Sequence, residues 1–392
     1  MTECPQDFLL EILHLIYYNE GTKYRYWRRF TLKKIRTVKG DIAPEKMGVT
    51  TMHDHTISDF TEMHAKTKAR MTHVPAEKRK YIPENFTFFN DGGAVLCEHE
   101  SFGTVDFYEK EIGYFKEAGG NTIVDGSPAG MRRTEQIIEL ANRVDVNIIC
   151  ATGLYTAEDR LNQYKGWSKA QQKEMFEREI IEGMDGTNVK AGFLKAAMSG
   201  PAEDGIHCNP IELETVFACA ELSAKYGMPF HLHPPAVSLD VTLDLIDEIL
   251  AIGVDPDKFV MLHQCLHVLP VQYYVMHPEA TRAVSIENQL KILEKGVNIS
   301  IDNWGLMKNF PGMCRSDDYD TLKQLVQLIQ AGYGDKIVLG HDFANFTYSK
   351  AMGCHGYTRI LEFTMPMLRN LGFGEDVINK LFVDNPARIM AF

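Results

Sequence analysis

The sequence lacks an apolar run long enough to cross a membrane, and it shows no cleavable leader pattern. Its longest N-terminal apolar stretch, residues 8–18, is interrupted by Glu11 and His14, whereas a membrane-spanning helix needs about 20 apolar residues. Cysteine is sparse and scattered, and the 8 cysteines form no C-x-x-C pair. This pattern is typical of reduced thiols in the cytoplasm. We therefore expect a cytoplasmic protein with no membrane partner.

The chain also has fewer positively than negatively charged residues. The chain carries 41 Lys and Arg against 53 Asp and Glu, a formal net charge of -12. A groove for nucleic acid would have to be built against this overall field. We therefore expect no nucleic-acid partner and a small-molecule substrate instead.

What the chain does have is an alternation of short β-rich apolar runs with longer stretches of helical period. The alternation predicts eight strands, at residues 49–57, 121–125, 147–152, 189–196, 229–233, 259–263, 297–302 and 337–342. Helices are expected between them at residues 104–118, 134–143, 169–183, 210–226, 239–251, 281–295 and 319–331, with a closing helical region from residue 358. This order is typical of parallel strands joined by crossover helices. It predicts an α/β fold, a closed (β/α)8 TIM barrel.

Two segments depart from the regular spacing. Residues 1–36 are interpreted as an N-terminal helical extension, and residues 37–392 as one barrel domain. The link between the first strand and the first helix, residues 59–103, is about 45 residues long and rich in charged and aromatic residues. A link of this length is more typical of a folded flap over the barrel mouth than of a free loop.

Six side chains with metal-binding potential fall at or near the carboxyl ends of five strands, where the active residues of such barrels cluster. They are His53, His55, Lys195, His233, His263 and Asp342. Residues two apart on a strand point the same way, so both imidazoles of His53-Asp-His55 point inward and Asp54 points outward. Any one histidine alone is more often a hydrogen-bonded core residue, but six such placements together are hard to attribute to chance. We expect His231 and His341 to point away from the barrel axis.

Lys195 is an unusual residue in a set of candidate metal ligands. An uncompensated buried ammonium is strongly disfavoured, and four histidines with one aspartate offer little negative charge to two dications. An amine that has reacted with carbon dioxide is a carbamate, which can act as a bridging carboxylate. A carboxylated Lys195 between two divalent cations would explain the placement.

Short motifs surround these six residues. They read Thr51-Met-His-Asp-His55, Ala191-Gly-Phe-Leu-Lys195, Gly227-Met-Pro-Phe-His-Leu-His233, Gly340-His-Asp342, His355-Gly-Tyr357 and Asn385-Pro-Ala-Arg388. From about residue 37 to the C-terminus the chain thereby resembles the phosphotriesterase family of the amidohydrolase superfamily, in its carboxylated-lysine group. The resemblance is compatible with a homodimer.

The resemblance implies a binuclear metal-dependent hydrolase. His53, His55 and Asp342 would hold the more buried ion, His233 and His263 the more exposed one, and carboxylated Lys195 would bridge them. Zinc is the expected ion, with manganese, cobalt and iron as alternatives that also suit these ligands. A bridging hydroxide would attack the substrate, and Asp342 would carry its proton to the leaving group.

Several substrates are compatible with such a site. We expect an ester or lactone, in particular a small sugar lactone that is phosphorylated or not. The alternatives are a phosphotriester or an N-acyl amide hydrolysed at the same site, and a ligand-binding barrel without catalysis.

The chain departs from the family in the loops that select substrate. It reads Asp302-Asn-Trp-Gly305 and Gln264-Cys-Leu-His267, where homoserine-lactone hydrolases of the family have D-R-Y-G and G-D-T-D. These departures argue against acyl-homoserine lactones and organophosphates as native substrates. Six residues are expected to contact the substrate, with ordinary loop packing as the alternative: Tyr155, Asp302, Trp304, Lys308, Arg315 and His267.

Overall fold

The computed structural model describes residues 33–59, 75, 103–265, 269–270, 285–305, 309–310, 313–314, 317–344 and 346–392. Most of the expected N-terminal extension and most of the long link after the first strand lie outside these residues. Three expected substrate contacts, His267, Lys308 and Arg315, lie outside them as well.

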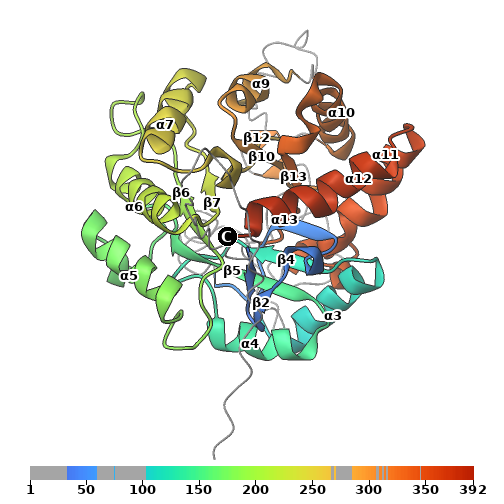
Figure 1. The fold of residues 1–392 in the computed structure, drawn as a ribbon, viewed down its shortest axis with the longest axis horizontal. Coiled ribbons are helices and arrows are strands. Elements are labelled where there is room, and N and C mark those ends of the chain that lie inside the picture. The colour runs from blue at the N-terminus through green and yellow to red at the C-terminus, as the bar shows by residue number, and fades with distance from the viewer. Residues whose placement is uncertain are drawn as a thin grey trace, which may run out of the picture.

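Eight parallel strands form the wall of a barrel (Figure 1). They are β3 (Thr50–Asp54), β4 (Thr122–Asp125), β5 (Asn147–Leu154), β6 (Phe193–Ala197), β7 (Phe230–His233), β8 (Phe259–Met261), β10 (Asn298–Ile301) and β13 (Ile337–Leu339). Each pairs in parallel with the next one in this order. The first and last strands meet where Asp342 N–H donates to the His53 carbonyl at 2.8 Å. The predicted (β/α)8 barrel is confirmed.

Helices surround the strands on the outside, except that the last helix lies across one end of the barrel and adds Ile389 and Met390 to its interior cluster (Figure 1). They are α3 (Val105–Glu117), α4 (Thr134–Arg143), α5 (Lys169–Ile181), α6 (Pro210–Tyr226), α7 (Leu239–Ala251), α9 (Glu287–Glu294) and α10 (Asp318–Leu328), followed by α11 (Met365–Asn370), α12 (Glu375–Asn379) and α13 (Asn385–Met390). Their starts follow from local chemistry, because Ser168, Asn209 and Ser238 accept hydrogen bonds from the first backbone N–H groups of α5, α6 and α7.

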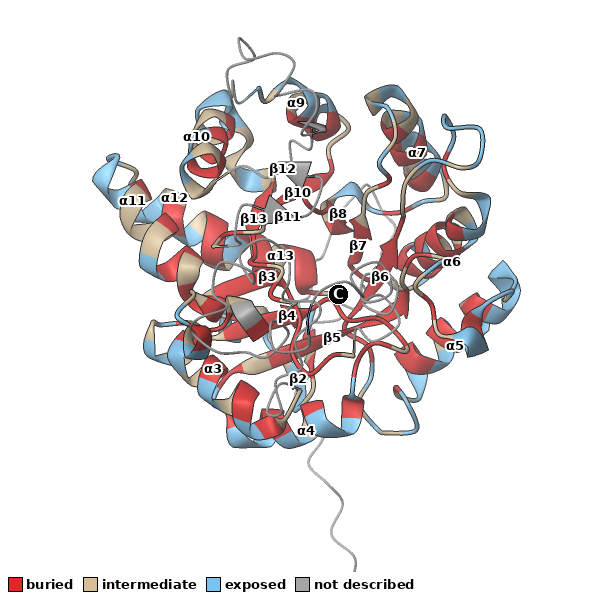
Figure 2. Cartoon of the chain, turned by 180° about the vertical axis from the view of Figure 1, so that it is seen from behind, coloured by how far each residue is buried: buried red, intermediate tan, exposed pale blue. Residues whose placement is uncertain are grey.

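The core has two parts, which together bury the inner faces of the helices and both faces of the strands (Figure 2). One part lies between the strands and the helices. The other fills the barrel interior with strand residues such as Val124, Ile149, Phe193 and Val260. A barrel filled in this way is closed below the strand ends, so a ligand has access only from the mouth.

Two glycines let neighbouring strands approach closely beneath the mouth. A Cβ at Gly153 would lie 1.8 Å from the Lys195 carbonyl oxygen, and one at Gly340 would lie 2.7 Å from the backbone nitrogen of His53. Both contacts involve a residue of the predicted metal site. The spacing of these strands therefore helps to set the positions of Lys195 and His53.

Smaller elements flank the barrel. The hairpin of β1 (Ile35–Thr37) and β2 (Gly40–Ile42) places Ile35 in the interior cluster. Short strands β9 (Leu269–Pro270), β11 (Asn309–Phe310) and β12 (Met313–Cys314) form an antiparallel sheet from the segments that follow β8 and β10. Within the described ranges, no helix has both the length and the apolar character that crossing a bilayer requires.

Candidate metal centre

Four of the six predicted ligands converge at one point of the barrel mouth. The Nε2 atoms of His53 and His55 lie 3.6 and 3.3 Å from Oδ1 of Asp342. Nζ of Lys195 lies 3.3 Å from Nε2 of His53. His53, His55 and Asp342 offer three ligand atoms within 4.8 Å of one another, which is close enough to share one ion.

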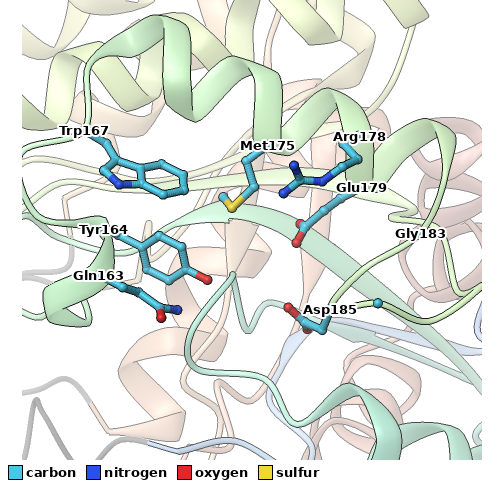
Figure 3. A pocket seen from close by; sticks show the side chains of 9 residues that line it. Gln163, Tyr164, Trp167, Met175, Arg178, Glu179, Gly183 and Asp185 are labelled. Atoms are coloured by element: carbon cyan, nitrogen blue, oxygen red, sulfur yellow. The ribbon is translucent and has the colours of Figure 1, made fainter.

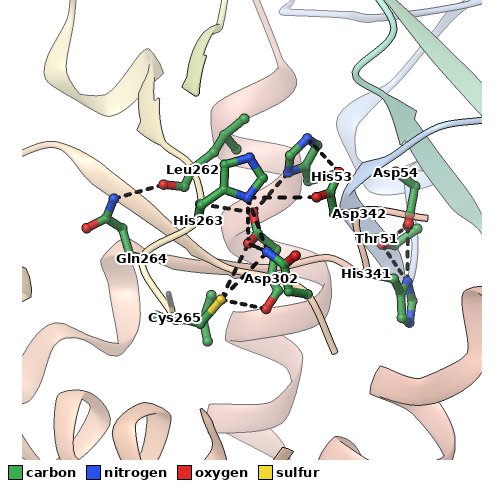
Figure 4. A network of polar contacts seen from close by, with 12 residues as sticks. Thr51, His53, Asp54, Leu262, His263, Gln264, Cys265, Asp302, His341 and Asp342 are labelled. Atoms are coloured by element: carbon green, nitrogen blue, oxygen red, sulfur yellow. Dashed lines mark hydrogen bonds and ion pairs between the residues drawn. The ribbon is translucent and has the colours of Figure 1, made fainter. Parts of the chain in front are cut away.

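The other two predicted ligands stand beside this group. The ring centroid of His263 lies 4.8 Å from that of His53 and 4.4 Å from that of His233. Figure 4 shows His53, His263 and Asp342 facing a common space. The structure therefore brings together side chains that are separated by up to 289 positions in the sequence.

A buried carboxylate orients two of the imidazoles. His53 Nδ1 and His263 Nδ1 donate to the two oxygens of Asp302, at 2.9 and 3.1 Å. The backbone N–H of His263 also donates to Asp302, at 3.1 Å. Protonation at Nδ1 leaves Nε2 free to bind a metal. The grouping of His53, His263 and Asp302 is therefore a hydrogen-bonded support, although its atoms also lie within metal-sharing distance.

His55 has its own support. Its Nδ1 lies 2.8 Å from the hydroxyl of Ser127, and the Ser127 N–H donates to Asp125 at the end of β4. The Tyr357 hydroxyl donates to the backbone carbonyl of His55 at 2.6 Å. The imidazole and the backbone of His55 are thus both held by residues that are not among the predicted metal ligands.

The backbone at the strand ends is unusual. His263, Asn303 and Asp342 have φ values of 57°, 64° and 56°, a left-handed region that side-chain-bearing residues rarely adopt. Such conformations persist only where the surrounding structure enforces them, and they concentrate at functional sites. The regular strands end shortly before these residues, β8 at Met261 and β13 at Leu339.

The protonation states suit metal binding, which requires neutral imidazoles and a charged carboxylate. Burial and the nearby Lys195 lower the pKa of His53 to about 4. Burial and His263 hold the pKa of His233 well below its usual range. Burial alone would raise the pKa of Asp342, but His53 and His55 outweigh it and lower that pKa.

Lys195 is also shifted toward its neutral form. Its side chain is buried and forms no salt bridge with any described carboxylate. Burial lowers its pKa to about 8, with Asp342 and Asp302 opposing the shift. A neutral amine is the form that can react with carbon dioxide.

Three of the six expected substrate contacts lie in the described part of the chain: Tyr155, Asp302 and Trp304. Tyr155 lies beside the centre, with its ring centroid 6.1 Å from that of His233, so its role as a contact stays a prediction. Asp302 is fully buried beneath two imidazoles, and Trp304 is 1% exposed with its Nε1 donating to the Ile301 carbonyl. Both side chains lie below the surface of the mouth, and their role as substrate contacts stays a prediction.

Three further side chains lie close to the predicted ligands in the sequence: Asp54, His231 and His341. Asp54 points away from the centre, as expected, and accepts hydrogen bonds from His341 and from the Phe343 N–H. The expectation for His231 was wrong. Its ring lies 4.6 Å from that of Phe193 in the barrel interior, because His231 and His233, two apart, share one side of the strand.

The comparison with known proteins agrees with this geometry. Residues 33–390 match the sequence model of the Phosphotriesterase family. The chain belongs to this family. Its relatives include N-acetyltaurine hydrolase of Xenopus tropicalis, 26% identical over 92% of this chain and 98% of that protein. Phosphotriesterase-related protein of Nematostella vectensis is 27% identical over 91% and 98%.

Solved structures share the fold. A lactonase mutant of Deinococcus radiodurans, described as phosphotriesterase-like, superposes with a TM-score of 0.67 at 21% identity, covering 91% of this chain and 99% of that one. A resiniferatoxin-binding protein from Rhodobacter sphaeroides gives a TM-score of 0.72, also at 21% identity, with coverage of 91% and 94%. The chain is thus a hydrolase of a family of binuclear metal enzymes, and its described residues include groups that can bind metal.

Proposed function

We propose that this member of the phosphotriesterase family uses two divalent cations to hydrolyse the amide bond of a small N-acyl compound. The observation that carries the proposal is the convergence of His53, His55, Lys195 and Asp342 within 3.3–3.6 Å contacts at the barrel mouth. His53, His55 and Asp342 would hold one ion, His233 and His263 the other, and carboxylated Lys195 would be shared by both.

The donor set supports this assignment. Zinc, our expected ion, binds imidazole and carboxylate ligands, and three of the histidines have their Nδ1 atoms near Asp302 or Ser127. When bound, the cations would lower the pKa of a water molecule and polarise the carbonyl oxygen of the substrate. A carbamate on Lys195 would supply negative charge that an ammonium cannot.

Asp342 is the residue that we propose to move the proton. Its Oδ1 faces two imidazoles, while 21% of its side chain remains exposed to the mouth. It is therefore placed to accept a proton from the attacking water and to deliver it to the departing nitrogen. This delivery matters for an amide, because an unprotonated amine anion is a very poor leaving group.

The names of the relatives support an amide rather than a lactone. N-acetyltaurine hydrolases from Xenopus tropicalis and Homo sapiens align with 92% of this chain and with 98% of their own length, at 26% and 24% identity. The lactonase likeness comes from structures at about 21% identity, which speak for the fold alone. A lactone therefore serves as the comparison substrate.

The test is a substrate panel assayed with the metal-loaded protein: N-acetyltaurine, other N-acyl amines, a sugar lactone and a phosphotriester. We expect the highest kcat/KM on an N-acyl compound. Hydrolysis of lactones with none of the N-acyl compounds would overturn the proposed bond.

The Asp342→Asn variant tests the mechanism separately. We expect it to retain metal but to lose about 10²–10⁴-fold in kcat, the usual contribution of a general acid or base. Near-normal turnover in this variant, with its metal content measured in the same sample, would contradict the assigned role.

A further inference from the structure

A cavity lies between helix α5 and the segments on either side of it, apart from the candidate metal centre (Figure 3). Its volume is about 310 Å³, which is within the range of small-molecule sites. It is lined by residues of the short helix η5 (Asn162–Tyr164), of α5 and of the turn that follows α5. None of these residues belongs to the candidate metal centre.

One side of the cavity is aromatic. The rings of Tyr164 and Trp167 stand at 87° to each other with centroids 5.1 Å apart. In Figure 3 the side chain of Met175 lies beside them. Ring faces carry partial negative charge and attract organic cations, and two rings at a right angle offer such a cation two contacts.

A fixed carboxylate lies on the opposite side. Asp185 accepts hydrogen bonds from Arg132 Nε at 2.8 Å, from Arg132 Nη2 at 3.3 Å and from the Thr134 hydroxyl at 2.6 Å. A carboxylate has about four acceptor sites, so about one remains. The side chain is 37% exposed, and the remaining site is therefore available to a ligand.

The same buried arginine holds a second carboxylate. Arg132, whose side chain is fully buried, also donates to Glu179, and the Thr152 hydroxyl donates to the other oxygen of Glu179. Both oxygens of Glu179 thus have a hydrogen-bond partner, and burial raises the pKa of this carboxyl group although Arg132 opposes the shift. Two carboxyl groups thus share one buried guanidinium, and Asp185 is the more exposed of the two, at 37% against 5% for Glu179.

A cation stands at the rim. Arg178 lines the cavity and is exposed, and it makes neither an ion pair nor a side-chain hydrogen bond with any residue in the described part of the chain. Figure 3 shows its guanidinium between Met175 and Glu179. A free guanidinium is well suited to bind a carboxylate or a similar anion with two parallel hydrogen bonds.

We propose that this cavity binds a small zwitterion of the amino-acid class. Its ammonium group would lie against Asp185 and the faces of Tyr164 and Trp167, and its anionic group would bind Arg178. This site is separate from the metal centre, and the proposal is independent of the reaction catalysed there.

The test is isothermal titration calorimetry of the full-length, metal-loaded protein with three matched probes. 5-Aminopentanoate carries both charges, pentylamine only the positive one and pentanoate only the negative one. The variants are Arg178→Gln, which alters an exposed side chain, and Trp167→Leu. Lys110→Gln, an equal loss of charge on α3, is the matched control.

We expect 5-aminopentanoate to bind about tenfold or more tightly than either single-charge probe. Arg178→Gln should reduce its affinity to that of pentylamine, and Trp167→Leu should weaken both amine probes by about threefold to tenfold. Lys110→Gln should change neither. Because a carboxylate can also reach the metal centre, the difference between the wild-type protein and Arg178→Gln isolates the cavity.

Three results would overturn the proposal. Equal affinity for pentylamine and 5-aminopentanoate would indicate a simple cation site. Binding unchanged by Arg178→Gln would place the zwitterion elsewhere. No saturable binding of 5-aminopentanoate up to about 10 mM would show that the cavity does not select this class.

Discussion

Replacing Asp302 by Asn tests how the imidazoles are held, with almost no change in side-chain volume. The carboxylate is fully buried and receives His53 Nδ1, His263 Nδ1, the His263 N–H and the Asn303 side-chain amide. Burial alone would raise its pKa, but His263 and His53 more than offset this and hold it well below its usual range. Asp302 is therefore an acceptor on both oxygens, which Asn cannot be.

The expected loss of metal affinity follows from the tautomers of His53 and His263. In Asp302→Asn one imidazole must face an amide N–H₂, so its Nδ1 becomes the acceptor and its proton moves to Nε2, the atom needed for the metal. Loss of such a supporting partner typically lowers metal affinity 10–100-fold, or about 1.4–2.7 kcal/mol. The assay is a competition titration of zinc between the chelator-treated protein and an indicator of known affinity.

Asp54→Asn is the matched control. Asp54 is also fully buried and also pairs with a histidine, His341, but it points away from the centre. We expect this variant to lose thermal stability with a much smaller change in zinc affinity. A folded Asp302→Asn protein that binds zinc as tightly as the wild type would refute the reasoning about the tautomers.

Three further predictions address Lys195 and its surroundings. Lys195→Glu should retain more bound metal than Lys195→Met, because only the first restores a carboxylate; equal metal content by elemental analysis would argue against a carbamate. With a Lys195 pKa of about 8, the amine is mostly neutral above that pH, so at equal dissolved carbon dioxide reconstitution should be about tenfold faster at pH 9 than at pH 7. A pH-independent rate would contradict this. Gly153→Ala should lower the free energy of unfolding by about 3 kcal/mol, because its Cβ would lie 1.8 Å from the Lys195 carbonyl oxygen at a φ of 138°. Chemical denaturation measures this free energy of unfolding. An unchanged denaturation midpoint would show that β5 and β6 can separate to accommodate the added methyl group.

The sequence predicted the barrel because periodicity and strand length are local properties. All eight expected strands are present, and the expected helices at residues 134–143, 210–226 and 239–251 have the predicted bounds. The strand boundaries were less accurate. The strand expected at residues 189–196 is β6 (Phe193–Ala197), and the strand expected at residues 337–342 is β13 (Ile337–Leu339).

The positions of the predicted ligands at the strand ends also predicted that they would converge. The residues that hold their imidazoles by hydrogen bonds could not be predicted in this way. Asp302 and His53 are 249 residues apart, and nothing in the local sequence distinguishes a carboxylate under the metal site from one facing a substrate. Ser127 was missed for the same reason, although its position two residues after the end of β4 places it at the mouth. The expectation for His231 was wrong because His231 and His233 are two apart on β7 and so share one side of the strand, a parity that can be read from the sequence.

The most direct test of the central claim is anomalous diffraction from crystals of the metal-loaded protein, recorded on both sides of the absorption edge of the bound metal. We predict two anomalous peaks about 3.5–4 Å apart, one within bonding distance of His53, His55 and Asp342 and the other of His233 and His263, with density for a carbamate on Lys195 between them. A single peak, or none at full metal loading, would contradict the account.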